Sequence, residues 1–315
     1  MKEMLSVTSS PHVRHIDSTR SIMSDVVIAL CPAAVYGCIL FGWRAALMLA
    51  VCILSCVGAE YIWSIIFKKP NTIGDFSAVV TGLLLGMNLP PVPPDKPFIS
   101  YLGYIGIAII GSVVAIIVVK QMFGGLGHNF VNPAIAARIV LLVSFPSFMT
   151  TFSEPFSGIV ASATPLAAPD TVTVKELFFG MHSGSIGETS AFLLLIGGVY
   201  LMLRRVILPI IPVCFIGTVA LITLLTGGDV AAQLFSGGLF LGALFMATDY
   251  TTSPSTPVGS IIFGIGCGLL TFVIRRFGAL PEGVSYSIIL MNILVPHIDR
   301  LTAMKPFGAK EVGKS

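Results

Sequence analysis

Long apolar stretches recur along almost the whole sequence, and they limit its fold more than any other feature. A membrane-spanning helix needs about 20 mostly apolar residues, and ten stretches approach this requirement. They cover roughly residues 22–41, 45–67, 76–89, 99–119, 130–149, 190–203, 207–226, 234–248, 258–274 and 284–301. Only 10% of the residues are charged, against roughly 25% in an ordinary soluble domain. The sequence therefore predicts an all-α integral membrane protein with ten transmembrane segments.

Two of these segments are unlike the others. Segments 76–89 and 234–248 are short, contain glycine and are followed by proline-containing clusters at 90–94 and 253–257. Interrupted helices in corresponding positions are typical of transporter folds, where they form a binding site near the middle of the bilayer. We expect both segments to be broken helices.

The positions of lysine and arginine indicate an orientation. With the N-terminus in the cytoplasm, twelve of these residues fall on the cytoplasmic side and five on the outer side, and Arg138 lies within a segment. Cytoplasmic loops carry an excess of positive charge. We therefore expect a multi-pass protein of the plasma (inner) membrane with both termini in the cytoplasm. No basic cluster is large enough to indicate nucleic-acid binding.

A weak internal repeat divides the chain into two halves. The sequence KQMFGGL at 120–126 resembles IRRFGAL at 274–280, and each follows a glycine-containing segment. The predicted orientation places the two copies on opposite sides of the membrane, as inverted five-helix repeats require. The expected units are a cytoplasmic segment, the first repeat, an outer loop, the second repeat and a cytoplasmic tail, at residues 1–21, 22–149, 150–189, 190–301 and 302–315.

Several residues in the last part of the first repeat are candidates for cofactor binding. Gly124 and Gly125 permit a tight backbone approach ahead of Asn129 and Asn132, so that exposed amides there can receive a ring or a phosphate. Alternatively, the glycines only separate two helices. Arg138 lies within an apolar segment, where an unpaired charge costs roughly 3 kcal/mol. We expect it to pair with a phosphate or a carboxylate.

Four acidic residues lie in or at the ends of the segments: Asp25, Glu60, Asp75 and Asp249. Asp249 and Asp75 adjoin the two broken segments, and both are candidates for an ion path. The alternative for Asp25, Glu60 and Asp75 is a helix cap or a position at the water interface. The six cysteines are expected to be small core residues, and no metal site is expected.

The outer loop carries the sequence SATPL at 162–166, in which Pro165 favours an extended backbone at Thr164. Taken alone, Thr164 is an ordinary solvated hydroxyl. However, FGGLGHNFVNPA at 123–134, SATPL and MATD at 246–249 occur in this order in a chain with ten apolar segments. Together these motifs resemble the D subunit of Rnf-type ion-translocating oxidoreductases, a relative of the B subunit of the sodium-translocating NADH:quinone oxidoreductase. The resemblance extends from about Ser10 to Ile298.

The resemblance implies a covalent FMN, attached through its phosphate to Thr164, with Ser162 and Ala163 completing the attachment motif. It leaves open a second, noncovalent flavin such as riboflavin between the halves. It also implies partner subunits of the Rnf A, B, C, E and G types, with ferredoxin and NAD handled by those subunits while Na+ or H+ crosses the bilayer. The alternative function is a redox-free channel or secondary transporter for a small polar solute, because inverted repeats suit that role equally.

Overall fold

The computed structural model describes residues 18–70, 72–93, 97–156, 160–161, 172–278 and 283–303. Nearly all regular structure in these residues is helical. Their only strands are β1 (Phe152–Ser153) and β2 (Val160–Ala161), which form one short antiparallel pair. The predicted all-α class is confirmed.

The first half consists of five α-helical regions and one additional short helix. They are α1 (Thr19–Phe41), α2 (Trp43–Ile66), α3 (Ser77–Met87) with the preceding 3-10 turn η1 (Ile73–Asp75), α4 (Phe98–Val113) with its π-helical continuation η2 (Val114–Gln121), α5 (Pro133–Ser144) and α6 (Pro146–Met149). Local signals fix several ends. The Ser18 side chain accepts a hydrogen bond from the Ser21 N–H at the start of α1, and Gly42, with φ 74°, separates α1 from α2.

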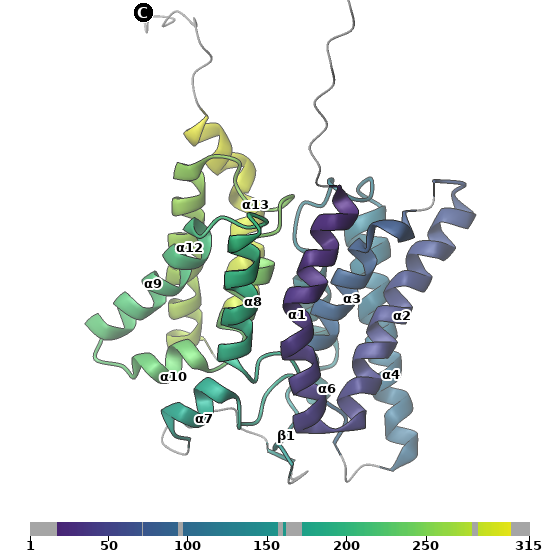
Figure 1. Ribbon diagram of the computed structural model, residues 1–315, viewed down its shortest axis with the longest axis horizontal. Helices are drawn as coiled ribbons and strands as arrows, with labels where there is room; N and C mark the ends of the chain where they lie inside the picture. The colour runs from purple at the N-terminus through teal and green to yellow at the C-terminus, as the bar shows by residue number, and fades with distance from the viewer. Residues whose placement is uncertain are drawn as a thin grey trace, which may run out of the picture.

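The second half has a similar series of helices. They are α7 (Val174–Phe179), α8 (Ala191–Leu203), α9 (Ile210–Leu225), α10 (Val230–Phe235), α11 (Leu239–Leu241) with its π-helical continuation η4 (Gly242–Met246), α12 (Pro257–Phe277) and α13 (Gly283–Thr302). Helix α7 begins with a capping box, and hydrogen bonds from Thr173 hold the pKa of Glu176 below its ordinary value. Helix α1 begins and α13 ends at one end of the molecule, whereas β1 and α7 lie at the other (Figure 1).

Both short segments are interrupted, as the sequence predicts. Helix α3 ends at Met87, and no helix follows in residues 88–93. In the second half, residues 236–238 separate α10 from α11, and Gly237 has φ 67°. The predicted single segment at 234–248 is therefore wrong in detail. Its first residues belong to α10, because the backbone at Gly237 adopts a left-handed conformation that ends the helix.

The two halves share one hydrophobic core and pack closely. Helix α1 lies against α8, and a side chain at Gly197 would overlap the carbonyl oxygen of Ala29. The loop before α8 also reaches the break after α3, where the Gly187 N–H donates to the Met87 carbonyl oxygen at 2.7 Å. A backbone hydrogen bond thus joins the first broken helix to the second half.

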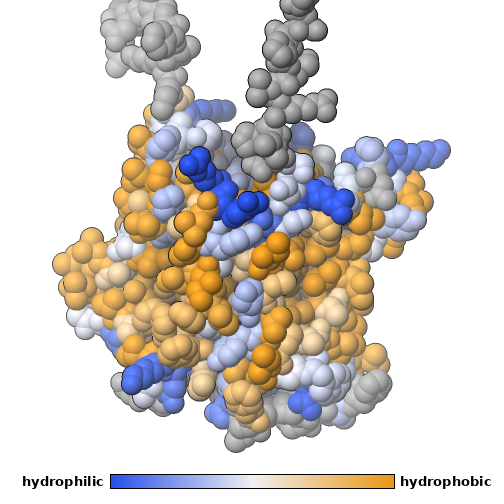
Figure 2. Space-filling model, viewed as in Figure 1, coloured by the Kyte–Doolittle hydropathy of each residue, from blue (hydrophilic) through white to orange (hydrophobic). Residues whose placement is uncertain are grey.

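The outer surface of the helices is strongly apolar. Within the residues that the structure describes, four helices are long and apolar enough to cross a membrane: Thr19–Phe41, Trp43–Ile66, Ile99–Gln121 and Pro257–Phe277. Hydrophobic residues form a band across the middle of the visible face, and hydrophilic residues gather toward its two ends (Figure 2). Such a surface fits a bilayer rather than water.

The cysteines do not all lie in the core. Cys52, Cys56 and Cys267 are buried, as expected, whereas Cys31 is exposed. The expectation of a core position is therefore wrong for Cys31. It lies on the face of α1 that no other part of the described chain covers, and the bilayer would cover it instead.

Candidate functional site

A cavity lies between the two halves, near the end of the molecule where α1 begins. It encloses about 720 Å³ of empty space, part of it open to solvent. Its walls are mainly apolar, and its polar lining residues are Ser77, Thr81, Lys120, Asn129, Asn132, Thr248 and Asp249.

Two predicted cofactor-binding residues, Asn129 and Asn132, line this cavity together. The Asn132 side-chain oxygen caps α5 by accepting from the Ala134 and Ile135 N–H groups, at 3.0 and 3.3 Å. Its amide nitrogen donates to the Met246 carbonyl oxygen at 3.1 Å, so Asn132 ties the start of α5 to the end of η4. The sequence pattern Asn-Pro at the start of a helix is well suited to this cap.

Asn129 differs from Asn132. Its side-chain oxygen is buried, yet it accepts no hydrogen bond from the described part of the chain. A buried acceptor without a donor costs about 1–3 kcal/mol. The Asn129 oxygen therefore fits a donor group on a molecule bound in the cavity.

The two predicted ion-path carboxylates lie at or next to the same cavity. Asp249 lines it, and its Oδ2 accepts hydrogen bonds from the hydroxyls of Thr251 and Thr252 at 3.1 and 3.2 Å. Asp75 accepts from the N–H and the hydroxyl of Ser77, the first residue of α3, at 2.8 and 2.6 Å. It thus lies at a helix end, as the alternative for Asp75 states, although the N-cap position of α3 is occupied by Phe76. Because Ser77 lines the cavity, Asp75 is one hydrogen bond away from it.

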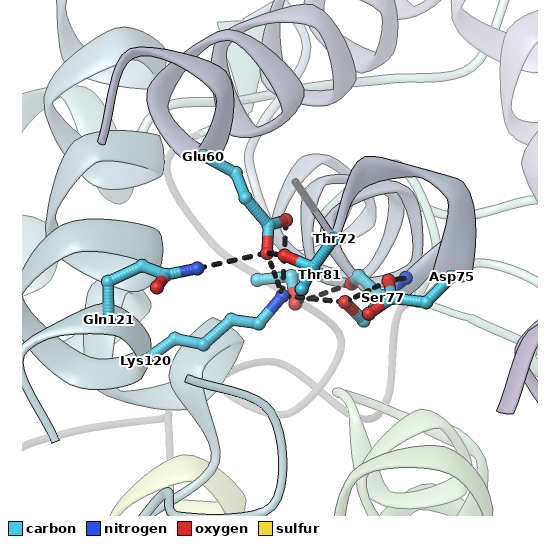
Figure 3. Close-up of polar contacts among 7 residues, drawn as sticks. All are labelled: Glu60, Thr72, Asp75, Ser77, Thr81, Lys120 and Gln121. Carbon is cyan, nitrogen blue, oxygen red and sulfur yellow. Dashed lines mark hydrogen bonds and ion pairs between the residues drawn. The ribbon is translucent and has the colours of Figure 1, made fainter. Parts of the chain in front are cut away.

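Lys120, which lines the cavity, forms a buried ion pair with Glu60, and Figure 3 shows this pair with its polar neighbours. Lys120 and Glu60 are each 1% exposed, and the Lys120 ammonium lies 3.0 and 3.2 Å from the two Glu60 oxygens. It also donates to the Ser77 hydroxyl at 2.6 Å. Glu60 therefore neither caps a helix nor lies at the water interface, which corrects that expectation. The reason is that η2 continues to Gln121 and carries Lys120 inward, onto the face of α2 that bears Glu60.

Arg138 has the carboxylate that its burial requires. Its guanidinium lies 2.6 Å from the Glu188 carboxylate, and both side chains are buried. It also donates to the Asn88 side-chain oxygen, directly after α3. Of the two partners considered for Arg138, a phosphate and a carboxylate, the structure therefore contains the carboxylate. Glu188 precedes α8, and a side chain at Gly238 would overlap its carboxylate, so this pair lies between the two helix breaks.

Sequence reasoning missed Glu188, because it lies in a loop with no motif around it. The need of Arg138 for a carboxylate was the only signal. Lys120 was also missed as a site residue, since its position at the end of an apolar segment made it part of a cytoplasmic loop. Lys120 and Glu60 are 60 residues apart in the sequence, so no local sequence pattern links them.

A third ion pair corrects the expectation for Asp25, which is buried within α1. Its carboxylate accepts from the Tyr200 hydroxyl at 2.9 Å and pairs with Arg204 at 3.1 Å. The start of α1 lies beside the end of α8, so Asp25 joins the two halves rather than capping a helix.

The remaining predicted residues do not line the cavity between the halves. Gly124 and Gly125 have φ values of 123° and 91° and lie between η2 and α5, so they separate two helices, as the alternative for them states. Their approach to a bound ring or phosphate stays a prediction. They line a neighbouring cavity of about 570 Å³ together with Glu60, Thr72 and Gln121. Arg138 is not among the residues that line either cavity. Ser162, Ala163 and Thr164 lie outside the described residues.

Comparisons with known proteins agree over nearly the full chain. Residues 6–308 match the NQR2, RnfD, RnfE family. The chain is 47% identical to the D subunit of the Na(+)-translocating ferredoxin:NAD(+) oxidoreductase complex of Acetobacterium woodii, over 98% of this chain and 97% of that protein. It is 42% identical to the D subunit of the proton-translocating ferredoxin:NAD(+) oxidoreductase complex of Clostridium ljungdahlii, over 98% of each chain. The D subunit of the ion-translocating oxidoreductase complex of Stutzerimonas stutzeri is 36% identical over 94% of each.

Proposed function

The chain belongs to the NQR2, RnfD, RnfE family, and from that premise we propose that it is the flavin-carrying electron-transfer subunit of an Rnf-type complex. It is a multi-pass membrane protein and one subunit of an ion-translocating oxidoreductase complex. The proposed complex couples electron transfer between ferredoxin and NAD to the movement of Na+ or H+. Ferredoxin and NAD react at other subunits.

The single observation that carries this proposal is the near-full-length similarity to D subunits of such complexes. The names of the first two of these relatives differ in the ion, Na(+) in one and proton in the other. The coupling of electron transfer to ion movement is therefore common to both, whereas the ion is not.

We place a covalent FMN on Thr164, in the loop at 150–189. A phosphoester tether prevents a redox cofactor from leaving an exposed site, and the flavin supplies one- or two-electron transfer when bound. Support comes from the order of the three motifs along the sequence and from the position of β1 and α7. These two elements lie within the loop, on either side of SATPL in the sequence, at the end of the molecule opposite the start of α1 (Figure 1). In the proposed orientation that end faces outward and both termini are cytoplasmic.

We propose that a second, noncovalent flavin binds at the cavity between the halves. The unpaired Asn129 oxygen offers an acceptor, Lys120 offers a positive charge, and Leu84, Ile207 and Phe245 offer apolar surface for a ring. These residues would bind and orient the flavin and exclude water from it. Asp249 on the same wall, and Asp75 behind Ser77, would then carry the ion path past it.

We also propose that the chain crosses the membrane ten times as two inverted five-helix repeats. The interruptions after α3 and before α11 support this arrangement, since each half contains one broken helix. A second support is that α1 begins and α13 ends at the same end of the molecule (Figure 1). An even number of membrane crossings requires this arrangement.

The test is flavin fluorescence of the denatured chain on a gel, after expression with a flavin transferase. We expect a fluorescent band for the wild type and for Thr173→Val, a control in the same loop, and none for Thr164→Val. A wild-type band without fluorescence would contradict covalent attachment and favour the redox-free transporter. Fluorescence that survives in Thr164→Val would place the flavin on another residue.

A further inference from the structure

The last turn of α12 carries two arginines, Arg275 and Arg276, whose side chains have different surroundings. Arg275 is half-buried and extends toward α10, where it donates to the carbonyl oxygens of Gln233 at 2.6 Å and Ser236 at 3.2 Å. A cation at the C-terminal end of a helix satisfies carbonyl groups that lack a partner within the helix. Arg275 therefore joins α12 to the end of α10. Arg276 is exposed and forms no hydrogen bond or ion pair with another described residue.

A cavity lies between the end of α9, helix α10 and the last turn of α12. It encloses about 950 Å³ of empty space, part of it open to solvent, and both arginines line it. The third charged residue of its lining is Asp229, which caps α10 by accepting from the Ala231 and Ala232 N–H groups at 2.9 and 3.2 Å. The lining thus carries two positive charges and one negative charge. This surplus of positive charge favours an anionic ligand.

Most polar groups of this cavity already have partners. The hydroxyls of Thr223 and Thr226 donate to carbonyl oxygens one turn earlier in α9, at 2.7 and 2.9 Å. The Gln233 side-chain oxygen accepts from Arg275 at 3.3 Å, whereas the Gln233 amide nitrogen has no acceptor among the described residues. The Arg276 guanidinium and the Gln233 amide are therefore the donors that a ligand can use. Two donors, one of them charged, suit the oxygen atoms of a phosphate.

The surface beside the cavity is apolar. Leu221, Leu224 and Leu225 on α9 and Phe277 at the end of α12 are large and exposed. Helix α10 lies beside α7, toward the end of the molecule that carries β1 (Figure 1), so the cavity lies near one edge of the apolar band that Figure 2 shows. The polar headgroups of a bilayer lie at such an edge. Basic pockets between transmembrane helices bind anionic lipid headgroups.

We propose that this cavity binds the phosphate of an anionic phospholipid, with Arg276 as the pairing cation and the Gln233 amide as a second donor. Arg275 holds Gln233 in place, and the acyl chains lie against the exposed leucines at the end of α9. In the proposed orientation the lipid belongs to the outer leaflet, where positive charge on a protein is otherwise scarce. The site itself requires neither that orientation nor a bound flavin.

The test compares two phospholipids that share their acyl chains. The full chain is purified in detergent and washed free of lipid, and its thermal unfolding midpoint is followed as dioleoylphosphatidylglycerol or dioleoylphosphatidylcholine is added. Choline cancels the phosphate charge of the second lipid. One arginine near the membrane surface strengthens the binding of an anionic lipid about fivefold. We therefore expect the wild type to reach half-saturation at about fivefold less phosphatidylglycerol than phosphatidylcholine, and Arg276→Gln to lose this preference.

Two further variants make the test specific. Arg300→Gln is the matched control, because Arg300 is also an exposed arginine in the last turn of a helix, α13, but does not line this cavity. It should keep the preference of the wild type. Arg276→Lys keeps the positive charge and should retain most of the preference. Equal binding of both lipids by the wild type would overturn the proposal, and so would equal losses in Arg276→Gln and Arg300→Gln.

Inorganic phosphate distinguishes a lipid from a free anion. Added at the same concentrations without lipid, it should leave the midpoint unchanged, because it has no acyl chains to lie against α9. A rise as large as that with phosphatidylglycerol would overturn the assignment to a lipid. Folding does not limit the test, since Arg276 is exposed and no described residue depends on it as a partner. None of these measurements detects flavin, so their outcome is independent of the test of Thr164.

Discussion

Two buried ion pairs of similar composition lie in different surroundings. Glu60 and Lys120 belong to the first half, and Thr72, Ser77 and Gln121 surround them with further hydrogen bonds. Arg138 and Glu188 instead join the first half to the second, next to the breaks after α3 and before α11. Both pairs keep their charged groups out of contact with lipid. Of the two, only the Glu60–Lys120 pair lines the cavities described above.

This difference separates a role in binding from a role in architecture. Open space adjoins the Glu60–Lys120 pair, because Lys120 lines one cavity and Glu60 lines the other. The space around Arg138 and Glu188 is filled by Asn88 and Gly238, so replacement would disturb both broken helices. We infer that the Arg138–Glu188 pair holds the two halves in register.

The largest effect is expected for Glu188→Ala. It leaves the Arg138 guanidinium buried without its carboxylate, and removal of one partner from a buried ion pair costs about 3–5 kcal/mol. Unfolding monitored in detergent should show this loss. The double variant Arg138→Met with Glu188→Met should recover much of it, because no buried charge remains. If Glu188→Ala is as stable as the wild type, the Arg138–Glu188 pair does not have an architectural role.

A smaller effect is expected where α1 crosses α8. Gly197→Ala should cost about 1–3 kcal/mol, because the added methyl group overlaps the Ala29 carbonyl oxygen and forces the two helices apart. Gly217→Ala in α9 is the matched control, since open space surrounds that position, and it should be neutral or stabilising by up to about 1 kcal/mol. Equal stabilities of the two variants, measured by the same unfolding assay, would show that the halves are not packed closely there.

The smallest effect is expected for the third ion pair. Arg204 pairs with Asp25, but its side chain is 51% exposed, and exposed pairs contribute about 0–1 kcal/mol. Arg204→Ala should therefore change the unfolding free energy by less than about 1 kcal/mol. A loss as large as that of Glu188→Ala would mean that exposure does not distinguish the pairs.

Much of the fold follows from the sequence, because lipid enforces simple rules. Apolar length locates the helices, and glycine with proline marks the two interruptions, although Gly237 moves the second one. The side-chain partners do not follow in the same way. Arg138 clearly needs a carboxylate, but only the folding of the loop before α8 onto the α3 break determines that Glu188 provides it.

The same limit applies to the candidate site. Asn129, Asn132 and Asp249 are recognisable from motifs, and they line one cavity. Lys120 is hidden from sequence reasoning because the π-helical turn η2 carries it past the predicted end of its segment and into the protein. A helix-end lysine and a mid-helix glutamate become a pair only when α2 and η2 pack together.

The most direct test of the proposed function is the mass of the peptide that contains Thr164, from the chain purified after expression with a flavin transferase. We predict an increase equal to one FMN less one water, located on Thr164 by fragmentation and absent from Thr164→Val. An unmodified Thr164 peptide from a complex that still transfers electrons would contradict the proposal that this subunit carries a covalent flavin there.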